Sequence, residues 1–466
     1  MSAIVDPIDT VQISEELIRR FDRSGPRYTS YPTADRFADD FSADNYIAAL
    51  QQRQQLVSPP PYSVYVHLPF CASLCYFCAC NKIITQDQAR SRSYVETVLQ
   101  ELRLLDPYLG EQRLTGQLHL GGGTPTFLQA DELKHLMQGL QRHFHFTADA
   151  ELGIEIDPRT VNAQTLSFLA ELGFNRTSFG VQDFNPDVQQ AINRIQPFEQ
   201  VEMAMVSSRA TGFESVNTDL IYGLPKQTVN SFSQTVDALV SLRPDRIALY
   251  NYAHLPQRFK AQRLIDPADL PSADARLQIF LMAAQRLLDA GYQYIGLDHF
   301  ALPEDELNVA RLDRSLHRNF QGYTTRAESD LIGLGVSAIG KVGQTHIQNQ
   351  RSLKAYRTAI EAEQLATFRG HVMSADDVLR AEVIMALMCS MPVDFAQMNR
   401  RYQIDMASYF SAEINALAPY AAAGLLEVDE EHIQVTAAGR LFVRAISMEF
   451  DAYLRQTTSA TYSRLI

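Results

Sequence analysis

Short apolar runs alternate with longer amphipathic stretches from Tyr62 onward. The longer stretches, such as VETVLQELRLL and DELKHLMQGLQ, have the spacing of helices with one apolar face. A strand followed by a helix, repeated between about residues 62 and 255, predicts an α/β fold with a parallel sheet, either open or closed into a partial (β/α)6 barrel. The short runs read as its strands: YSVYVHL, QLHLGGG, ELGIEID, RTSFGVQ, ESVNTDLIYG and RIALYNYA.

The segments on either side of this repeat have other patterns. Residues 1–60 hold two short helical patterns around the loop GPRYTSYPT and end at the helix-breaking SPPP. After the repeat come a long helix (Asp274–Gly291), the strand-like YQYIGLDHF and the glycine-rich LIGLGVSAIG. From about His371, three helices, a hairpin and a last helix resemble a winged helix. We therefore expect an N-terminal arm at 1–60, the barrel at 61–300, a connecting region at 301–370 and a mainly helical domain at 371–466.

Composition narrows the class of protein. The 466 residues are 46% hydrophobic and 20% charged, which is typical of a soluble globular chain. No apolar run approaches the roughly 20 residues of a membrane span, and the acidic start lacks the layout of a signal peptide. The net charge of −13 argues against binding nucleic acid over a broad surface. We expect a cytoplasmic protein, and an acidic surface of this kind fits a monomer.

Four of the five cysteines fall within ten residues, as Cys71, Cys75, Cys78 and Cys80. In a cytosolic chain such a group indicates metal binding or catalysis rather than disulfides. The spacing C-x3-C-x2-C can wrap three thiolates around an iron–sulfur cluster and leave one iron open. The alternative is a structural zinc site that uses all four, for which the single residue between Cys78 and Cys80 is awkward. Cys389, alone in an apolar stretch, reads as a packing residue.

Polar and glycine residues gather where the predicted strands end. Ligand sites of parallel α/β folds lie at these carboxyl ends, so we expect the site there. Two carboxylates, Glu155 and Asp157, follow the same strand. A carboxylate at Glu155 can take a ligand's ammonium or hydroxyl groups, and we expect Asp157 to cap the next helix, which begins with Pro158. The residues at the strand ends are His67, Gly121–Thr124, Glu155–Asp157, Gln182, Asp219 and Asn251–His254.

The cysteine motif, with Phe77 before its last ligand, resembles the radical S-adenosylmethionine superfamily, and HLGGGTPT resembles that superfamily's glycine motif. Over nearly the whole chain the sequence resembles the oxygen-independent coproporphyrinogen III oxidases (dehydrogenases) of haem biosynthesis. PRYTSYPT and CYFCACN distinguish it from the shorter radical-SAM haem chaperone. The other matching motifs are IEIDPRT, FNRTSFGVQDFN, NTDLIYGLPKQT, YNYAHLP, HRNFQGYTT and GLGVSAI.

The resemblance implies the reaction. A [4Fe–4S] cluster on Cys71, Cys75 and Cys78 would bind S-adenosylmethionine at its open iron and reduce it to a 5′-deoxyadenosyl radical. This radical would take hydrogen from the β-carbon of a propionate, which then loses CO2 and one electron. Two such steps would convert coproporphyrinogen III to protoporphyrinogen IX, with an external electron donor and acceptor.

The resemblance also implies which residues bind S-adenosylmethionine. The family places a second S-adenosylmethionine beside the first, either as a second co-substrate or as a feature of crystals only, and this sequence does not show how residues divide between them. Gly121, Gly122 and Gly123 would let backbone approach the amino-acid end of the ligand. The expected cofactor-binding residues are Tyr65, Phe77, Gly122, Gly123, Thr124, Glu155, Gln182, Arg194, Asp219, Ile221, Ala253 and Ile339.

Two residues are candidates for the reaction itself. Cys80 would not ligate iron, and its position next to the cluster suits either a hydrogen or electron role or a structural thiol. The substrate carries four propionates, so positive charge must offset the acidic chain, and Arg27 in PRYTSYPT is the main candidate. Tyr28, Tyr31, His317 and Arg318 are weaker ones.

Three other functions stay open on the sequence. They are a haem-binding chaperone with a vestigial radical site, a haem-degrading radical-SAM methyltransferase, and a winged-helix regulator with a structural metal. PRYTSYPT, Cys80 and HRNFQGYTT count against the first two. The third leaves the glycine motif and the polar strand ends without a role.

Overall fold

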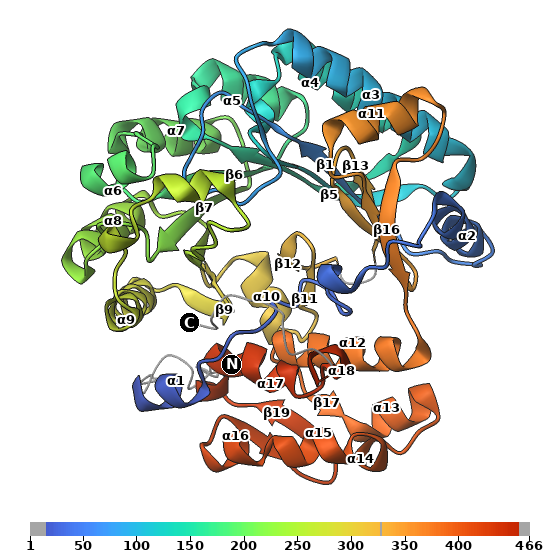
Figure 1. Cartoon of the computed structure of the whole chain (residues 1–466), viewed down its shortest axis with the longest axis vertical. Coiled ribbons are helices and arrows are strands. Elements are labelled where there is room, and N and C mark those ends of the chain that lie inside the picture. The colour runs from blue at the N-terminus through green and yellow to red at the C-terminus, as the bar shows by residue number, and fades with distance from the viewer. Residues whose placement is uncertain (1–14, 327–328, 456–466) are drawn as a thin grey trace. The chain divides into compact units, whose positions relative to one another are not determined.

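The computed structural model describes residues 15–326 and 329–455 (Figure 1). The chain forms two units, each assembled from separate stretches of sequence. The barrel unit comprises Phe37–Ile279 and the described residues of Glu328–Val372. The helical unit takes the described residues of Met1–Arg36, Phe280–Ala327 and Met373–Ile466. No helix in the described ranges is both long and apolar enough to cross a membrane.

The barrel unit contains the six expected strands as parallel neighbours, which confirms the predicted α/β class. They are β1 (Tyr62–Leu68), β4 (Leu114–Gly122), β5 (His145–Ile156), β6 (Arg176–Gln182), β7 (Ser215–Tyr222) and β8 (Arg246–Asn251). Figure 1 shows helices along one face of this curved sheet. The helices between the strands are α3 (Ala89–Leu105), α4 (Ala130–His143), α5 (Ala163–Glu171), α6 (Pro186–Ala191), α7 (Phe198–Ala210) and α8 (Val229–Leu242).

The sheet also extends beyond β1, which the sequence pattern did not predict. β13 (Asp330–Leu334) pairs parallel to β1, and β14 (Ile339–Val342), β15 (Thr345–Asn349) and β16 (Thr367–Val372) follow as antiparallel strands. The glycine-rich LIGLGVSAIG is thus two strands joined by a turn. Helix α2 (Ala43–Gln54) packs on β14 and β15, and α11 (Leu353–Glu361) packs on α3.

The two faces of this sheet differ in chemistry. Side chains alternate along a strand, and directly paired residues share a face, so the register assigns every position. The face under α3–α8, here called the outer face, carries fully buried apolar side chains such as Val66, Leu118, Ile154, Val216 and Leu249. The opposite, inner face carries polar ones: Tyr65 and His67 of β1, His119 of β4, Glu155 of β5 and Asp219 of β7.

The outer face therefore holds the unit together. Each fully buried aliphatic side chain contributes about 1.5–3 kcal/mol through removal of apolar surface from water. Polar side chains on the inner face contribute little of this kind. Their presence at the carboxyl ends of the strands needs a functional reason, as the sequence predicted.

The helical unit confirms the winged-helix-like pattern at the C-terminus. Helices α12 (Ala375–Met388) and α13 (Phe395–Tyr402) lead to a third helical stretch that is broken into α14 (Met406–Tyr409), α15 (Ser411–Ala416) and α16 (Ala418–Ala422). The hairpin β18 (Leu426–Val428) and β19 (His432–Val435) gains a further strand, β17 (Val393–Asp394). The last predicted helix is a 3-10 turn (Ala438–Phe442) that continues as α17 (Val443–Met448), before α18 (Ala452–Arg455).

One expected strand in this unit is wrong. YQYIGLDHF folds into the hairpin β9 (Gln293–Gly296) and β10 (His299–Ala301), because Leu297 takes a left-handed φ of 47° and turns the chain. The other elements are α1 (Glu15–Phe21), α9 (Ala273–Asp289, shared with the barrel unit), α10 (Glu306–Leu312), and the hairpin β11 (His317–Asn319) and β12 (Gly322–Thr324).

Candidate functional site

The cysteine loop leaves the sheet directly after β1. Cys71 ends the short strand β2 (Phe70–Cys71), and the chain returns through β3 (Ile83–Ile84), which pairs parallel to β2. Three hydrogen bonds tie the loop to other elements: Tyr76 N–H to Ile192 O (3.0 Å), Asn193 Nδ2 to Leu74 O (2.7 Å) and Gln262 Nε2 to Phe77 O (3.0 Å). The loop is therefore held at the carboxyl end of the sheet.

Hydrogen-bond donors surround two of the predicted cluster sulfurs. Thr124 Oγ1 lies 3.5 Å from Cys71 Sγ. Arg194 Nη1 and Arg159 Nη2 lie 3.5 and 3.8 Å from Cys75 Sγ. Hydrogen bonds to the sulfurs are typical of iron–sulfur sites, so this donor set fits such a cluster.

The sulfurs are not gathered around a single point. Within residues 15–326 and 329–455, no three Cys, His, Asp or Glu side chains converge as ligands of one metal ion. Each thiolate of a cube-shaped cluster binds a different iron, so cluster ligands stand farther apart than those of one ion. The three-cysteine set therefore stays a prediction that this finding does not test.

Cys78 and Cys80 contact each other. The Cys80 thiol donates to the Cys78 sulfur, which raises the pKa of Cys80 and lowers that of Cys78 to about 6. Lys82 adds to the lowering, and its ammonium donates to Cys78 O at 2.8 Å. Cys80 therefore keeps its proton in this contact, whereas Cys78 favours the thiolate.

The glycine motif closes against the same loop. Gly123 N–H donates to Leu68 O, and Thr124 N–H donates to Phe70 O, each at 2.8 Å. Gly122 has a φ of 111°, and a Cβ there would meet the His67 ring at 2.5 Å. A Cβ on Gly123 would meet Phe70 O at 2.7 Å. Only glycine fits both positions, because β1 and β2 pack closely against them. The approach of a ligand to this backbone stays a prediction.

Glu155 lies at the centre of the inner face. Its carboxylate accepts from Gly122 N–H at 2.9 Å and lies 3.4 Å from His119 Nε2. Burial would raise the pKa of Glu155, but the bonds from His119 and Gly122 outweigh it and lower the pKa. Tyr65 stacks on His119 and bonds His67 Nδ1 at 3.1 Å. His119 was not predicted, although it stands two residues before the glycine motif on the same face of β4.

Asp157 acts as predicted. Its side chain caps the 3-10 turn Pro158–Thr160 by accepting from Arg159 N–H. It also pairs with the guanidiniums of Arg159 (2.6 Å) and Arg194 (3.1 Å). Burial opposes ionisation, and these two arginines lower the pKa of Asp157 despite it. Asp157 therefore fixes the two arginines whose nitrogens lie beside Cys75.

Gln182 and Arg194 both lie beside Gly180, where a Cβ would meet their side chains at 2.7 and 3.0 Å. Gln182 has a left-handed φ of 67°, and within the described residues its buried Oε1 has no hydrogen-bond partner. An unsatisfied buried oxygen is costly and fits a place that a ligand completes. Burial, reinforced by Glu155, raises the pKa of Asp219 on the neighbouring strand to about 7.

The apolar members of the predicted set lie in the same unit. Phe77 and Ile221 pack with Tyr76 and Leu270 against one buried cluster. Gln262 Nε2 donates to both Phe77 O and Ala253 O (3.0 and 3.1 Å), so these two positions are linked. Ile339 begins β14, where its register with Gln348 puts it on the inner face.

The substrate candidates belong to the helical unit. Arg27 pairs with Asp298 at 3.0 Å. Tyr28 and Tyr31 are buried: Tyr28 donates to Asp451 Oδ2 (2.9 Å), and Tyr31 OH accepts from Ala452 N–H (3.1 Å). These tyrosines anchor the N-terminal segment. Arg318 is buried over the ring of Tyr323, at 4.8 Å from its centroid, and His317 lies beside it on β11.

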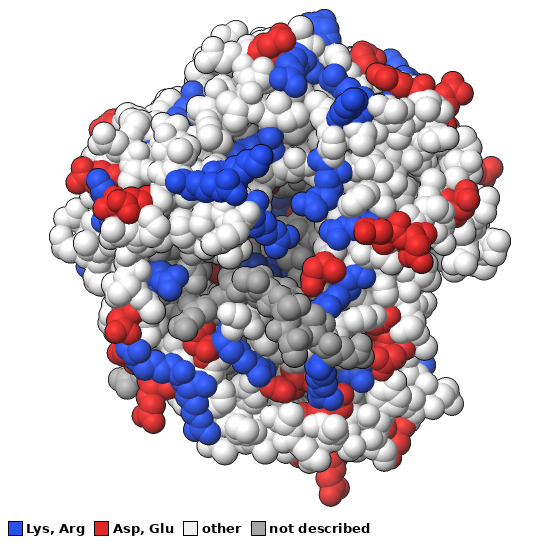
Figure 2. Space-filling model, in the orientation of Figure 1, with Lys and Arg blue, Asp and Glu red and all other residues white. Residues whose placement is uncertain are grey.

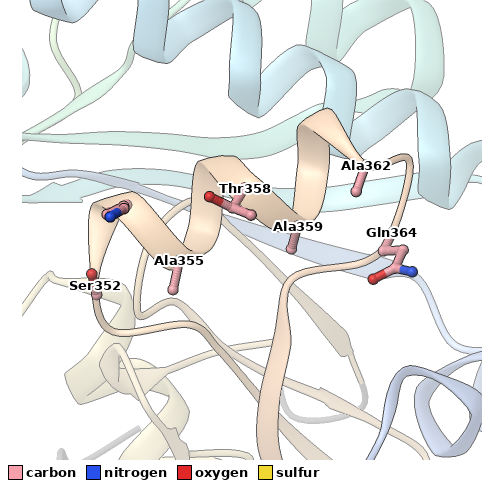
Figure 3. Close-up of a pocket in the computed structure, with 7 residues that line it drawn as sticks. Ser352, Ala355, Thr358, Ala359, Ala362 and Gln364 are labelled. Atoms are coloured by element: carbon pink, nitrogen blue, oxygen red, sulfur yellow. The ribbon is translucent and has the colours of Figure 1, made fainter.

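A groove along α11 is the feature drawn in Figure 3. Its labelled residues are small or uncharged: Ser352, Ala355, Thr358, Ala359, Ala362 and Gln364. Lys354 completes the lining. None of the predicted site residues lies there, and no thiol, imidazole or carboxylate lines it, so this groove is not a candidate for the chemistry.

Comparison with known proteins agrees with this geometry. Residues 65–239 match the radical SAM superfamily, and residues 373–442 match the HemN C-terminal domain. The chain is 45% identical to the oxygen-independent coproporphyrinogen III oxidase of Pseudomonas aeruginosa, over 98% of this chain and 100% of that protein. It is 47% identical to the enzyme of that name from Salmonella typhimurium, over 97% and 98%.

The chain belongs to the oxygen-independent coproporphyrinogen III oxidase family. A solved structure of coproporphyrinogen III oxidase from Escherichia coli, described as a radical SAM enzyme, matches with a TM-score of 0.90 and 45% identity. The match covers 95% of this chain and 99% of that one. The predicted family and fold are confirmed, and a [4Fe–4S] cluster and S-adenosylmethionine follow from membership. The chaperone, methyltransferase and regulator hypotheses do not account for this full-length match.

Proposed function

We propose that this chain carries out the oxygen-independent oxidative decarboxylation of coproporphyrinogen III in haem biosynthesis. Two propionate side chains become vinyl groups, and the product is protoporphyrinogen IX. The observation that carries this proposal is similarity at 45% identity over 98% of the chain, with the cysteine loop and the inner-face residues in place. An external electron donor and acceptor complete the reaction.

When bound, the cluster and S-adenosylmethionine supply one-electron, hydrogen-abstracting chemistry. Cys71, Cys75 and Cys78 hold the cluster in this proposal, and the guanidinium groups of Arg159 and Arg194 donate to the Cys75 sulfur. In this proposal the glycine motif, which lies against the cysteine loop, contacts the amino-acid end of S-adenosylmethionine.

The inner face then orients the cofactor. Glu155 is ionised because its pKa is lowered, so it accepts the ligand's ammonium through a charge-assisted bond. Asp219 accepts from the ribose hydroxyls, and Gln182 Oε1 gains the partner that it lacks. Phe77, Ile221, Ala253 and Ile339 supply apolar and backbone contacts. A second S-adenosylmethionine would share this set.

Two residues are assigned to the substrate step. Cys80, next to Cys78, acts as a hydrogen or electron donor, and Arg27 offsets the charge of the propionates. A Cys80→Ser variant that keeps its cluster and full turnover would leave Cys80 a structural thiol. An Arg27→Gln variant should raise the KM for porphyrinogen without changing affinity for S-adenosylmethionine. We further propose that the enzyme works as a cytoplasmic monomer.

The test is anaerobic turnover of the reconstituted protein. Coproporphyrinogen III, S-adenosylmethionine, a reductant and a crude extract as the source of acceptor are supplied, and mass spectrometry follows the porphyrin. We expect two successive losses of CO2, with formation of 5′-deoxyadenosine. Cleavage of S-adenosylmethionine with intact porphyrin would overturn the proposed substrate, and haem would be the next ligand tested.

A further inference from the structure

The inner face of β14, β15 and β16 is basic. The register pairs Lys341 with His346 and His346 with His371, in one row across the three strands. The next row pairs Ile339 with Gln348 and Gln348 with Arg369. Members of the two rows are two residues apart on each strand, so all six side chains share one face.

This face is on the same side of the sheet as the cofactor residues. β13 links the two regions, because Leu331 pairs with Lys341 on one side and with Ser63 of β1 on the other. Ser63 lies two residues before Tyr65 on the same face of β1. Ile339, one of the predicted cofactor contacts, is itself a member of the basic face.

The opposite side of these strands is closed by α2. Asp330 precedes Leu331, so its carboxylate lies on the other face, where it pairs with Arg53 of α2 at 2.7 Å. The sequences of β14, β15 and β16 contain no aspartate or glutamate. The basic face thus carries Lys341 and Arg369 with no acidic residue of its own strands among them.

The two cations are held in different ways. Arg369 Nε donates to Gln348 Oε1 at 2.7 Å, and its guanidinium lies 5.8 Å from the centroid of the Phe37 ring, which also stacks on His346. Within the described chain no carboxylate lies within ion-pair distance of the Lys341 ammonium. Burial lowers the pKa of Lys341, and Asp330 only partly offsets this.

A half-buried ammonium without a carboxylate partner is costly to maintain. Binding of an anion beside the ammonium would offset this unfavourable free energy. The whole chain carries a net charge of −13, but Figure 2 shows that lysine and arginine side chains still gather in places on the side in view, with acidic ones among them. Local positive charge of this kind attracts a polyanionic ligand to an acidic protein.

We propose that the inner face of β14–β16, through Lys341 and Arg369, binds a carboxylate of the porphyrinogen substrate. This inference rests on the proposed function, and it names the group that binds one propionate side chain. S-adenosylmethionine also carries a carboxylate, so the experiment separates the two sources.

The probe is coproporphyrin III, the stable oxidised form of the substrate, bound to cluster-loaded protein and followed by its fluorescence. Lys341→Met and Arg369→Gln should each weaken its binding about tenfold, the usual size for loss of one charge-assisted bond. Coproporphyrin III tetramethyl ester, which has no carboxylates, should bind wild type and variants alike. Lys341→Arg keeps the charge and should restore binding.

Lys354→Met is the matched control, since Lys354 is an exposed lysine on α11. Equal affinities of wild type, Lys341→Met and Arg369→Gln for coproporphyrin III would overturn the inference. So would weakened binding of S-adenosylmethionine with unchanged porphyrin binding, because the carboxylate would then be that of the cofactor. Failure of the proposed function would give a different result, because wild type itself would then not decarboxylate coproporphyrinogen III.

Discussion

Ile154 and Glu155 are neighbours on β5, and they belong to two regions with opposite tasks. Ile154 points to the outer face, where it is fully buried under helices. Glu155 points to the inner face, where it contacts His119 and the glycine motif. One strand thus serves stability and chemistry at once, because its side chains alternate. A substitution on the outer face should therefore lower stability, and one on the inner face should weaken ligand binding.

The largest effect should come from the cysteine loop at the carboxyl ends of the strands. Cys75→Ser removes a soft ligand that two arginines stabilise, so we expect loss of bound iron and of all measurable turnover. Iron analysis and the visible absorbance of the cluster check this. Cys389→Ala is the control, because Cys389 is buried in the helical unit. A cluster of normal content in Cys75→Ser would contradict the ligand set.

The outer face should respond through stability. Ile154→Ala leaves a cavity under the helices and should lower the free energy of unfolding by about 2–5 kcal/mol. Urea denaturation measures it. Affinity for S-adenosylmethionine should stay at the wild-type value. If Ile154→Ala weakens the binding of S-adenosylmethionine as much as Glu155→Gln does, the assignment of stability to the outer face and of binding to the inner face is wrong.

Glu101, a buried carboxyl group in the outer layer of helices, differs from Glu155 in the direction of its pKa shift. Glu101 of α3 accepts from Gly335 N–H, Tyr356 OH and Asn349 Nδ2 at 2.7, 2.7 and 2.5 Å. Burial raises the pKa of Glu101 to about 7 despite these three neutral donors. Glu155, with a histidine beside it, has a lowered pKa instead.

Between its unfolded pKa of about 4.3 and its folded pKa of about 7, Glu101 holds a proton that the unfolded chain has lost. Stability should therefore fall as pH rises through this window, by up to about 3 kcal/mol. Urea unfolding at pH 5 and pH 8 measures the fall. Glu101→Gln should remove this part of the pH dependence. If the free energy of unfolding of wild type and of Glu101→Gln changes equally between pH 5 and pH 8, the pKa of Glu101 is not raised by folding.

The smallest effect should come from the inner face. Glu155→Gln keeps the size of the side chain and removes its charge, so affinity for S-adenosylmethionine should fall about 10- to 100-fold. Anaerobic titration calorimetry measures it. Glu151→Gln is a matched control on the same strand and face, because Glu151 lies four residues before Glu155 on β5, at 3.5 Å from Arg176. A similar loss in both variants would mean that general charge, rather than Glu155, governs binding.

Much of the barrel unit could be predicted from local pattern. The six parallel strands have apolar runs that a short window detects, and the cysteine and glycine motifs are contiguous. β13–β16 escaped prediction because they are short and because β13 pairs with β1, far away in sequence. YQYIGLDHF was misread because its turn depends on one left-handed residue, Leu297.

The sequence by itself determined the alternation of the six parallel strands with their helices, and the family, since each depends on residue type and spacing along the chain. The tertiary structure decided which side chains meet. It placed Arg159 and Arg194 beside Cys75, His119 beside Glu155, and Lys341 in one row with His346 and His371. These contacts join residues that are distant in sequence, and strand register, which depends on the whole sheet, brings them together.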